Sequence, residues 1–187
     1  AYTEAYLAAK KNFYRKTAEE IIQYVLRDMT DSSGGFYSAE DADSEGKEGK
    51  FYLWKENEID EILKEDSKFF KRSFNISAGG NFTEETGSSP EGTNILHKQS
   101  RDSELAAKFN MSEEEFSEKV ETCRRKLFNE RIKRIHPHKD DKILTDWNGM
   151  MISALSLAYR AFGKKEYYNA AKKSADFIIN NLLKEIG

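Results

Sequence analysis

The sequence predicts a mainly helical protein built from αα-hairpins, with a small β-hairpin inserted near residues 35–54. Two observations support this fold class. Apolar side chains recur with helical period in two pairs of segments, at 2–29 and 147–185, and a short charged break divides each pair. Between the two pairs, residues 30–146 are richer in Gly, Ser and clustered charges. We therefore expect two helical hairpins joined by an insert that carries the chemical motifs.

Each hairpin has its own sequence signature. In the first, an apolar stripe follows the break at 10–12, and it consists of Tyr14, Ala18, Ile21, Ile22, Val25, Leu26 and Met29. In the second, segment 147–162 is small and apolar nearly all round, which predicts an inner, buried helix. The two hairpins also align weakly with each other, either as an internal repeat or because amphipathic hairpins look alike.

The insert is expected to begin with strands and continue with helices. Phe36-Tyr37 and the segment 51–54 are the predicted arms of the β-hairpin, on either side of an acidic, Gly-rich turn. Short helices are expected near 56–63 and 66–74, followed by a long irregular loop over 75–102. A further helix begins at Ser112, whose capping box is completed by Glu115.

The hairpin pattern also places the insert. If the first helix of each hairpin runs up and the second runs down, both short breaks lie at one end. The segment after 29 and the loop at 130–146 then lie together at the opposite end. We expect the motifs of both segments to share that face.

Composition excludes several classes of function. The formal net charge is -3 with no basic face, so nucleic acid is not an expected partner. No apolar run is long enough to span a bilayer, and the lone Cys123 forms no internal disulfide, which predicts a cytoplasmic protein. A Gly-rich phosphate loop, a nucleophile elbow and a Cys-x-x-Cys pair are all missing from the sequence.

The first candidate site is the acidic run in GGFYSAEDADSEGKEGKFYLW, residues 34–54. Residues 41–46 resemble the start of an EF-hand loop, but Tyr52 stands where the bidentate Glu belongs. Alternatively, Glu40, Asp41 and Asp43 form a catalytic carboxylate cluster: two carboxylates ~6 Å apart repel by about 2.8 kcal/mol, roughly two pKa units. A solvated turn, in which salt screens that repulsion, is the third interpretation.

The second candidate site is the run RIHPHKDDKILTDWNGMM, residues 134–151. It gathers His138, Asp140, Asp141 and Lys142 just before an apolar helix. The two histidines at 136 and 138 lack the further ligands of a zinc site, and the remaining histidine, His97, lies in the long loop. We predict neither a metal nor a cofactor.

Three motifs carry a resemblance to a known family. GGFYSAEDADSEGKEGKFYLW, GTNILH at 92–97 and HKDDKILTDWNGMMISAL at 138–155 closely resemble the YyaL-like family, which is the spermatogenesis-associated protein 20 family of animals. That family combines a thioredoxin-like domain with an (α/α)6 toroid similar to N-acylglucosamine 2-epimerases and six-hairpin glycosidases. The resemblance implies that residues 1–187 are part of the toroid, that the thioredoxin-like domain is absent from this chain, and that the chain is a piece of a longer protein.

The resemblance also implies a function. A toroid of this kind holds a sugar-processing or sugar-binding cleft at the end where loops join its helices, with carboxylates and His or Lys as acid and base groups. The expected catalytic residues are Glu40, Asp41, Asp43, His138, Asp140, Asp141 and Lys142. The expected substrate-binding residues are Tyr37, Trp147, Asn148 and His97. Epimerase and hydrolase chemistry both remain open.

A non-catalytic alternative is a scaffold domain that partners the thioredoxin-like domain. We also expect the isolated chain to self-associate, because an incomplete ring exposes apolar helix faces.

Overall fold

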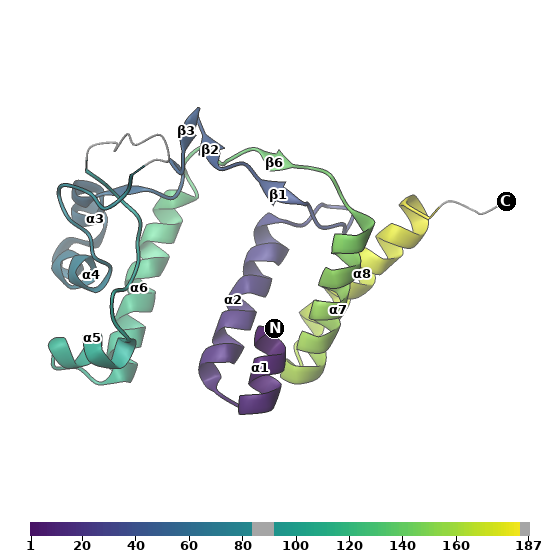
Figure 1. Ribbon diagram of the computed structural model, residues 1–187, viewed down its shortest axis with the longest axis horizontal. Helices are drawn as coiled ribbons and strands as arrows, with labels where there is room; N and C mark the ends of the chain where they lie inside the picture. The colour runs from purple at the N-terminus through teal and green to yellow at the C-terminus, as the bar shows by residue number, and fades with distance from the viewer. Residues whose placement is uncertain (84–91, 184–187) are drawn as a thin grey trace. The chain divides into compact units, whose positions relative to one another are not determined.

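The computed structural model describes residues 1–83 and 92–183, and it is mainly helical with a few two-residue β ladders (Figure 1). The predicted fold class is thereby confirmed. The chain divides into two compact units, which we describe separately: unit 1 comprises residues 1–40 and 139–187, and unit 2 comprises residues 41–138. Within the described ranges, no helix has the length and apolar character needed to cross a bilayer.

Unit 1 holds the two predicted helical hairpins. The first consists of α1 (Tyr2–Ala9) and α2 (Asn12–Asp28), and the second consists of α7 (Thr145–Phe162) and α8 (Lys165–Asn181). Both short breaks contain a left-handed residue, Lys10 with φ 55° and Gly163 with φ 74°, which ends the preceding helix and turns the chain back. The shared core consists of Ile22, Phe36, Leu155, Ala158, Tyr167 and Ala171.

Helix α7 is less buried than its sequence predicts. Only Asn148, Leu155 and Ala158 are buried, whereas the Met150 side chain is 64% exposed and Trp147 is 48% exposed. The expectation of a helix buried all round is therefore wrong for the described chain. The reason is that α1, α8 and the α2 residue Ile22 pack on one side of α7, while apolar side chains on its other side, such as Met150, are exposed.

A two-residue antiparallel ladder lies at the end of unit 1 where α2 ends and α7 begins. Strand β1 (Ala39–Glu40) pairs with β6 (Lys139–Asp140), with Ala39 opposite Asp140 and Glu40 opposite Lys139. A bridge from Thr30 to Phe36 folds the intervening loop back after α2. As predicted, segments distant in the sequence meet where α2 ends and α7 begins (Figure 1).

Unit 2 contains the rest of the insert. Its elements are β2 (Asp43–Ser44), β3 (Lys47–Glu48), β4 (Trp54–Lys55), α3 (Glu56–Leu63), the 3-10 turn η1 (Lys64–Asp66), α4 (Ser67–Ser73), β5 (Thr93–Asn94), α5 (Asp102–Lys108) and α6 (Glu113–Arg131). The short helices near 56–63 and 66–74 are confirmed. Part of the expected 75–102 loop, residues 84–91, lies outside the described residues.

The insert does contain a hairpin, but its arms differ from the prediction. Strands β2 and β3 pair across a tight turn at Glu45–Gly46, where both residues have positive φ, as a type I′ turn requires. The aromatic segments do not pair with each other, because Trp54 pairs with Asn94 and Phe36 pairs with Thr30. The β propensity of the aromatic residues correctly indicated extended segments, but it does not determine which segments pair, because strand pairing depends on long-range packing.

The core of unit 2 lies between α3, α4, α5 and α6. It is built on buried aromatic and aliphatic side chains, and Phe70, Phe116 and Ile59 are each 0% exposed. The predicted capping box is present: Glu115 N–H donates to Ser112 Oγ at 3.1 Å, and Ser112 N–H donates to Glu115 at 2.8 Å. Cys123 is buried in this core, and burial raises the pKa of its thiol. It packs as a small apolar side chain.

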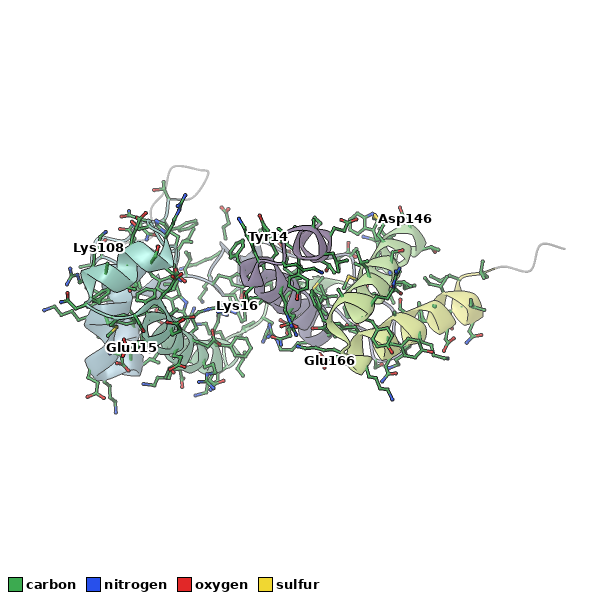
Figure 2. All side chains as sticks on the ribbon, turned by 90° about the horizontal axis from the view of Figure 1, so that it is seen from below. Tyr14, Lys16, Lys108, Glu115, Asp146 and Glu166 are labelled. Carbon is green, nitrogen blue, oxygen red and sulfur yellow. The ribbon has the colours of Figure 1, made fainter. Side chains whose placement is uncertain are left out.

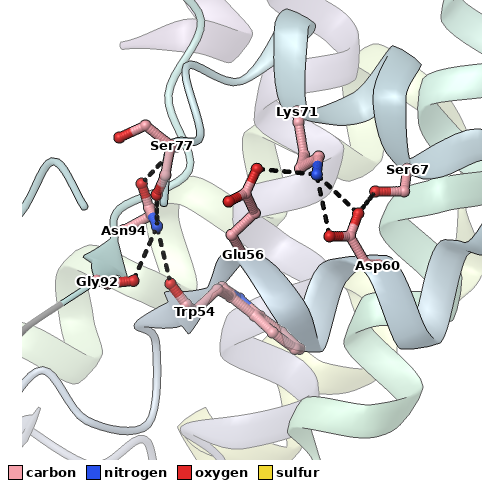
Figure 3. Close-up of polar contacts among 8 residues, drawn as sticks. All are labelled: Trp54, Glu56, Asp60, Ser67, Lys71, Ser77, Gly92 and Asn94. Carbon is pink, nitrogen blue, oxygen red and sulfur yellow. Dashed lines mark hydrogen bonds and ion pairs between the residues drawn. The ribbon is translucent and has the colours of Figure 1, made fainter. Parts of the chain in front are cut away.

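Polar side chains fix the remaining loop of unit 2 (Figure 3). Asn94 is fully buried, and its amide donates to the carbonyls of Trp54 (3.2 Å), Ser77 (3.1 Å) and Gly92 (3.2 Å). Nearby, the Lys71 ammonium bridges two carboxylates of α3, those of Glu56 (2.9 Å) and Asp60 (2.8 Å). The GTNILH motif therefore has a structural explanation, since its Asn ties together three backbone segments.

Charged side chains cover the outside of both units (Figure 2). Among the labelled residues, Lys16 and Asp146 project from unit 1, and Lys108 projects from unit 2. Such interspersed charges match the composition, in which a third of the residues are charged.

Candidate functional site in the loops of unit 1

The candidate site in unit 1 lies where residues 30–40 meet residues 139–148. We call this surface the loop face. The sequence places most of the predicted site residues here, and the β1–β6 ladder brings Glu40 beside the Lys139–Lys142 segment. The contacts of each side chain then decide what the loop face can do.

Asn148 holds the two loop segments together. Its side chain is 1% exposed; Oδ1 accepts from Phe36 N–H at 2.7 Å and from Ser174 Oγ at 3.2 Å. Its amide donates to the carbonyls of Phe36 (3.0 Å) and Leu144 (2.9 Å). All of its hydrogen-bonding positions are occupied, so Asn148 positions the loops, in contrast to the expectation that it contacts a ligand.

Two glycines allow this close packing. A Cβ on Gly35 would lie 2.6 Å from Ile143 Cδ1, and Gly34, at φ +115°, packs against Lys173 of α8. Side chains at these positions would push residues 34–36 away from α7 and α8. The Gly-Gly pair that marks the start of the first motif is therefore required by packing.

Strand alternation separates Glu40 from Asp140. Residues directly opposite in an antiparallel ladder share a face, so Glu40 shares one face with Lys139 and Asp140 shares the other with Ala39. Glu40 accepts a hydrogen bond from Tyr24 Oη of α2 at 2.8 Å, and the Lys139 ammonium donates to the Asp28 carbonyl. Both contacts point back onto α2, which leaves Glu40 as a half-buried anchor of the ladder.

Asp140 is held as an ionised carboxylate. Lys142 donates to it from Nζ at 2.9 Å and from its backbone N–H at 3.2 Å. These hydrogen bonds, with the side-chain bond first, lower the pKa of Asp140 below its usual value. A carboxyl group with a lowered pKa accepts hydrogen bonds at neutral pH but does not donate a proton. Asp140 thus fits a binding or basic role better than that of a general acid.

Tyr37 belongs to a second hydrogen-bonded group. Its hydroxyl donates to Asp31 Oδ2 at 2.8 Å, and this bond is the main cause that raises the pKa of Tyr37, with a smaller effect from Asp141. The hydroxyl and backbone N–H of Ser33, followed by Tyr37, lower the pKa of Asp31 to about 2. Sequence reasoning missed Asp31, although the run Asp-Ser-Ser-Gly-Gly is typical of an Asx turn.

Trp147 stands at the start of α7, beside the Asn148 anchor. The residue is 48% exposed, and its backbone N–H donates to Asp146 Oδ1 at 2.9 Å. Because Asn148 binds the backbone of Phe36, the backbones of the neighbouring residues in the chain, Trp147 and Tyr37, lie close together at the loop face. An exposed indole in this position offers a flat apolar surface with one polar edge.

The other predicted site residues belong to unit 2. Asp41 and Asp43 are exposed, and Asp41 Oδ1 accepts from Asp43 N–H at 3.1 Å in a local turn. His138 is exposed, and its carbonyl accepts from Asp41 N–H at 2.8 Å. His97 contacts Asn75 and the Ile95 carbonyl through its ring nitrogens. These contacts favour the solvated-turn interpretation of the acidic run.

The EF-hand interpretation does not fit this backbone. Residues 43–48 form the β2–β3 hairpin rather than a loop that wraps a cation. Within residues 1–83 and 92–183, no group of three or more His, Cys, Asp or Glu side chains is arranged to hold a metal ion.

Comparison with known proteins identifies the relatives of this chain. Human spermatogenesis-associated protein 20 is 31% identical to it over 196 residues, which cover 95% of this chain and 25% of the human protein. The chain is homologous to spermatogenesis-associated protein 20. The rat protein of that name is 30% identical over the same share of the chain, and an uncharacterized protein of Caenorhabditis elegans is 31% identical over 90% of it. No family model matches the sequence.

These matches confirm the resemblance to the spermatogenesis-associated protein 20 family. The chain spans about a quarter of the length of these relatives, so the activity and partners of the whole proteins come to this chain only as proposals.

Proposed function

We propose that the loop face of unit 1 binds a neutral, polyhydroxylated ligand of the sugar type. Asp140 carries the proposal: it is an ionised, partly exposed carboxylate beside a lysine ammonium, and it lies on the ladder face opposite Glu40. Carboxylates accept hydrogen bonds from hydroxyl groups, and ammonium groups donate to them. Asp141 and Lys142 supply further polar groups in the same loop.

Two aromatic rings complete the proposed site. Trp147 precedes Asn148 in the chain, and Tyr37 follows Phe36, whose backbone Asn148 binds. In the proposed site their ring faces pack on the C–H side of a sugar ring. In this arrangement the chain binds and orients the ligand. A hydrolase would in addition need a protonated carboxyl group, and Asp140 does not supply one because its pKa is lowered.

The helical hairpins support the same proposal. Antiparallel helix pairs with loops gathered at one end are the building unit of an (α/α)6 toroid, and we infer that unit 1 contributes to such a ring. Toroids of that class bind sugars at their loop end. The inference rests on the mainly helical fold and on the resemblance of the motifs.

The test is a titration with N-acetylglucosamine and, separately, glucose, followed through the indole N–H resonance of Trp147. Trp54 is 2% exposed and lies in unit 2, so its resonance is an internal reference. We expect saturable shifts of Trp147 with a dissociation constant in the range of about 1–10 mM, as befits a few hydrogen bonds and one stacking contact. Asp140→Asn is expected to weaken binding about tenfold, since a bond to a charged acceptor becomes a neutral one.

Asp176→Asn is the matched control. Asp176 also lies in unit 1, is exposed and pairs with a lysine, Lys172, at 2.6 Å, but this ion pair lies within α8. Its substitution should leave the titration unchanged. Absence of any saturable shift with either sugar up to about 50 mM would remove the proposal.

A scaffold function is the second candidate, and the exposed apolar side chains of α7 favour it. Met150 and Trp147 offer a surface that fits a protein partner, such as the thioredoxin-like domain implied by the resemblance. In that case the added domain, and not the sugars, would shift the Trp147 resonance.

A further inference from the structure

Unit 2 contains a cavity of about 770 Å³ that is separate from the loop face. It lies between the β2–β3 hairpin, the segment that leads into α3, and the chain that follows α6. Its lining residues all belong to unit 2. The volume falls in the range of about 300–1,000 Å³ that is typical of pockets for small molecules.

The floor of the cavity is apolar and is held in a fixed conformation. Phe51 and Leu53 line it, and both are less than a tenth exposed. Arg134 donates to the carbonyls of Phe51 (3.1 Å) and Leu53 (2.7 Å), and its guanidinium stacks 4.0 Å above the Trp54 ring. Because Arg134 ties the end of α6 to this segment, the floor is formed before any ligand arrives.

The rim of the cavity carries an excess of positive charge. Five lining side chains are cationic and three are acidic. Glu45 is paired with Lys50 at 2.7 Å, and Glu58 is paired with Arg134 at 3.0 Å. Lys47 and Lys55, both exposed, have no carboxylate within ion-pair distance in the part of the chain that the structure describes. Their ammonium groups remain available to an anion.

We propose that this cavity binds a small molecule that carries an anionic group on an apolar ring or chain. The apolar part packs on Phe51, Leu53 and Ile135, and the anion lies between the Lys47 and Lys55 ammonium groups. The two lysines come from different elements, β3 and β4, so the anion is held between two separate parts of the rim. The predicted catalytic carboxylates Glu40, Asp41 and Asp43 do not line this cavity, although it shares other residues with the first motif.

The experiment uses the whole chain and four probes: phenyl phosphate, benzoate, inorganic phosphate and benzyl alcohol. Amide shifts of residues 47–55 and 133–135 report the cavity, and those of residues 139–148 report the loop face. We expect phenyl phosphate to shift the cavity residues saturably, and inorganic phosphate and benzyl alcohol to bind at least about fivefold more weakly, because each makes half of the contacts. Benzoate distinguishes a general anion site from one that prefers phosphate.

Paired variants separate charge from packing. Lys47→Gln with Lys55→Gln should weaken phenyl phosphate about tenfold, at about threefold for each exposed charge, and should flatten the salt dependence. Ile135→Ser, at a side chain 62% exposed, should weaken phenyl phosphate and benzyl alcohol alike by about threefold. Lys16→Gln with Lys108→Gln removes two exposed charges outside the cavity and should change nothing.

Two results would overturn the proposal. One is phenyl phosphate shifting no cavity residue, or doing so no more tightly than inorganic phosphate. The other is equal affinity in the Lys47/Lys55 variant and its Lys16/Lys108 control. Sugar binding at the loop face is read from different residues, so either proposal can fail while the other stands.

Discussion

Replacement of Asn148 should separate the stability of the two units. In Asn148→Ala, the buried Phe36 N–H and the Ser174 hydroxyl lose their acceptor, and the Phe36 carbonyl loses its donor. The Leu144 carbonyl keeps the backbone bond from residue 148. An orphaned buried polar group costs about 1–3 kcal/mol. Three such groups predict a loss of about 5 kcal/mol from the free energy of unfolding of unit 1, a large share of the stability of a typical domain.

The assay is a urea titration in which each unit is followed by its own tryptophan. The indole resonance of Trp147 reports unit 1, and that of Trp54 reports unit 2. With a urea dependence of about 1–2 kcal/mol per molar, the Trp147 midpoint should fall by at least about 2 M. The Trp54 midpoint should not change, since Asn148 makes all of its hydrogen bonds within unit 1.

An aspartate at position 148 gives a pH-dependent version of the same test. Its carboxylate would face the carbonyls of Phe36 and Leu144, which accept from the Asn148 amide in the native protein. The folded-state pKa of this carboxyl is then raised above its unfolded value of about 4, so the penalty is greatest at neutral pH and shrinks as the pH falls. Asn148→Asp should therefore approach the native stability near pH 4.

The control for both variants is Asn169→Ala, which removes an exposed amide from α8 of the same unit. It should cost less than about 0.5 kcal/mol. A Trp147 midpoint that stays within about 0.5 M of the native value in Asn148→Ala would refute the anchoring role, as would an equal loss in the control.

Three further predictions concern other parts of the chain. The pKa of Asp31 is about 2 in the folded state, so its contribution to stability is present above about pH 4 and is lost as the pH falls toward 2. Asp31→Asn should therefore flatten the acid limb of a pH–stability curve between about pH 4 and 2, and an unchanged acid limb would contradict this prediction. Asn94→Ala leaves buried carbonyls of unit 2 without their donor, so it should lower the free energy of unfolding that Trp54 reports by about 3 kcal/mol and leave the unit 1 reporter unaffected. Met150→Lys places a charge on the exposed side of α7 and should reduce the self-association expected for the chain, as measured by sedimentation velocity; a native chain that is monomeric at high concentration would rule out that expectation.

The helices could be predicted because their signals are local. The apolar period of α2, the break at Gly163 and the Ser112 capping box each act within a few residues, and the structure contains all three features. The fold class follows from these signals alone. The meeting of loops 30–40 and 139–148 also followed from simple geometry, since helices of a hairpin alternate in direction.

Strand partners could not be predicted in the same way. Trp54 reads as the arm of a hairpin, yet it pairs with Asn94, forty residues further along the chain. Two-residue strands carry almost no register information, because period-2 alternation needs several residues to show itself. The exposure of α7 was also missed, because composition reports that a helix is apolar but not whether its partners are in the same chain.

The side-chain roles at the loop face depend on a single step of alternation. Glu40 and Asp140 are neighbours in the ladder, but one step of register puts Glu40 against Tyr24 and leaves Asp140 to Lys142. A sequence shows which carboxylates are close along the chain. It does not show which of these carboxylates accepts a hydrogen bond from another side chain of the fold, as Glu40 does from Tyr24.

Buried amides explain why motif density alone is a weak sign of catalysis. Both GTNILH and the Trp147–Asn148 segment centre on an asparagine that is at most 1% exposed and that binds the backbone of distant segments. Such an amide tolerates no replacement, since no other neutral side chain of its size both donates and accepts in one plane. The residues around it are then constrained by packing, whether or not they touch a ligand. The exposed groups beside each anchor, Asp140 in unit 1 and the lysines of the cavity in unit 2, are therefore the positions where substitution separates function from folding.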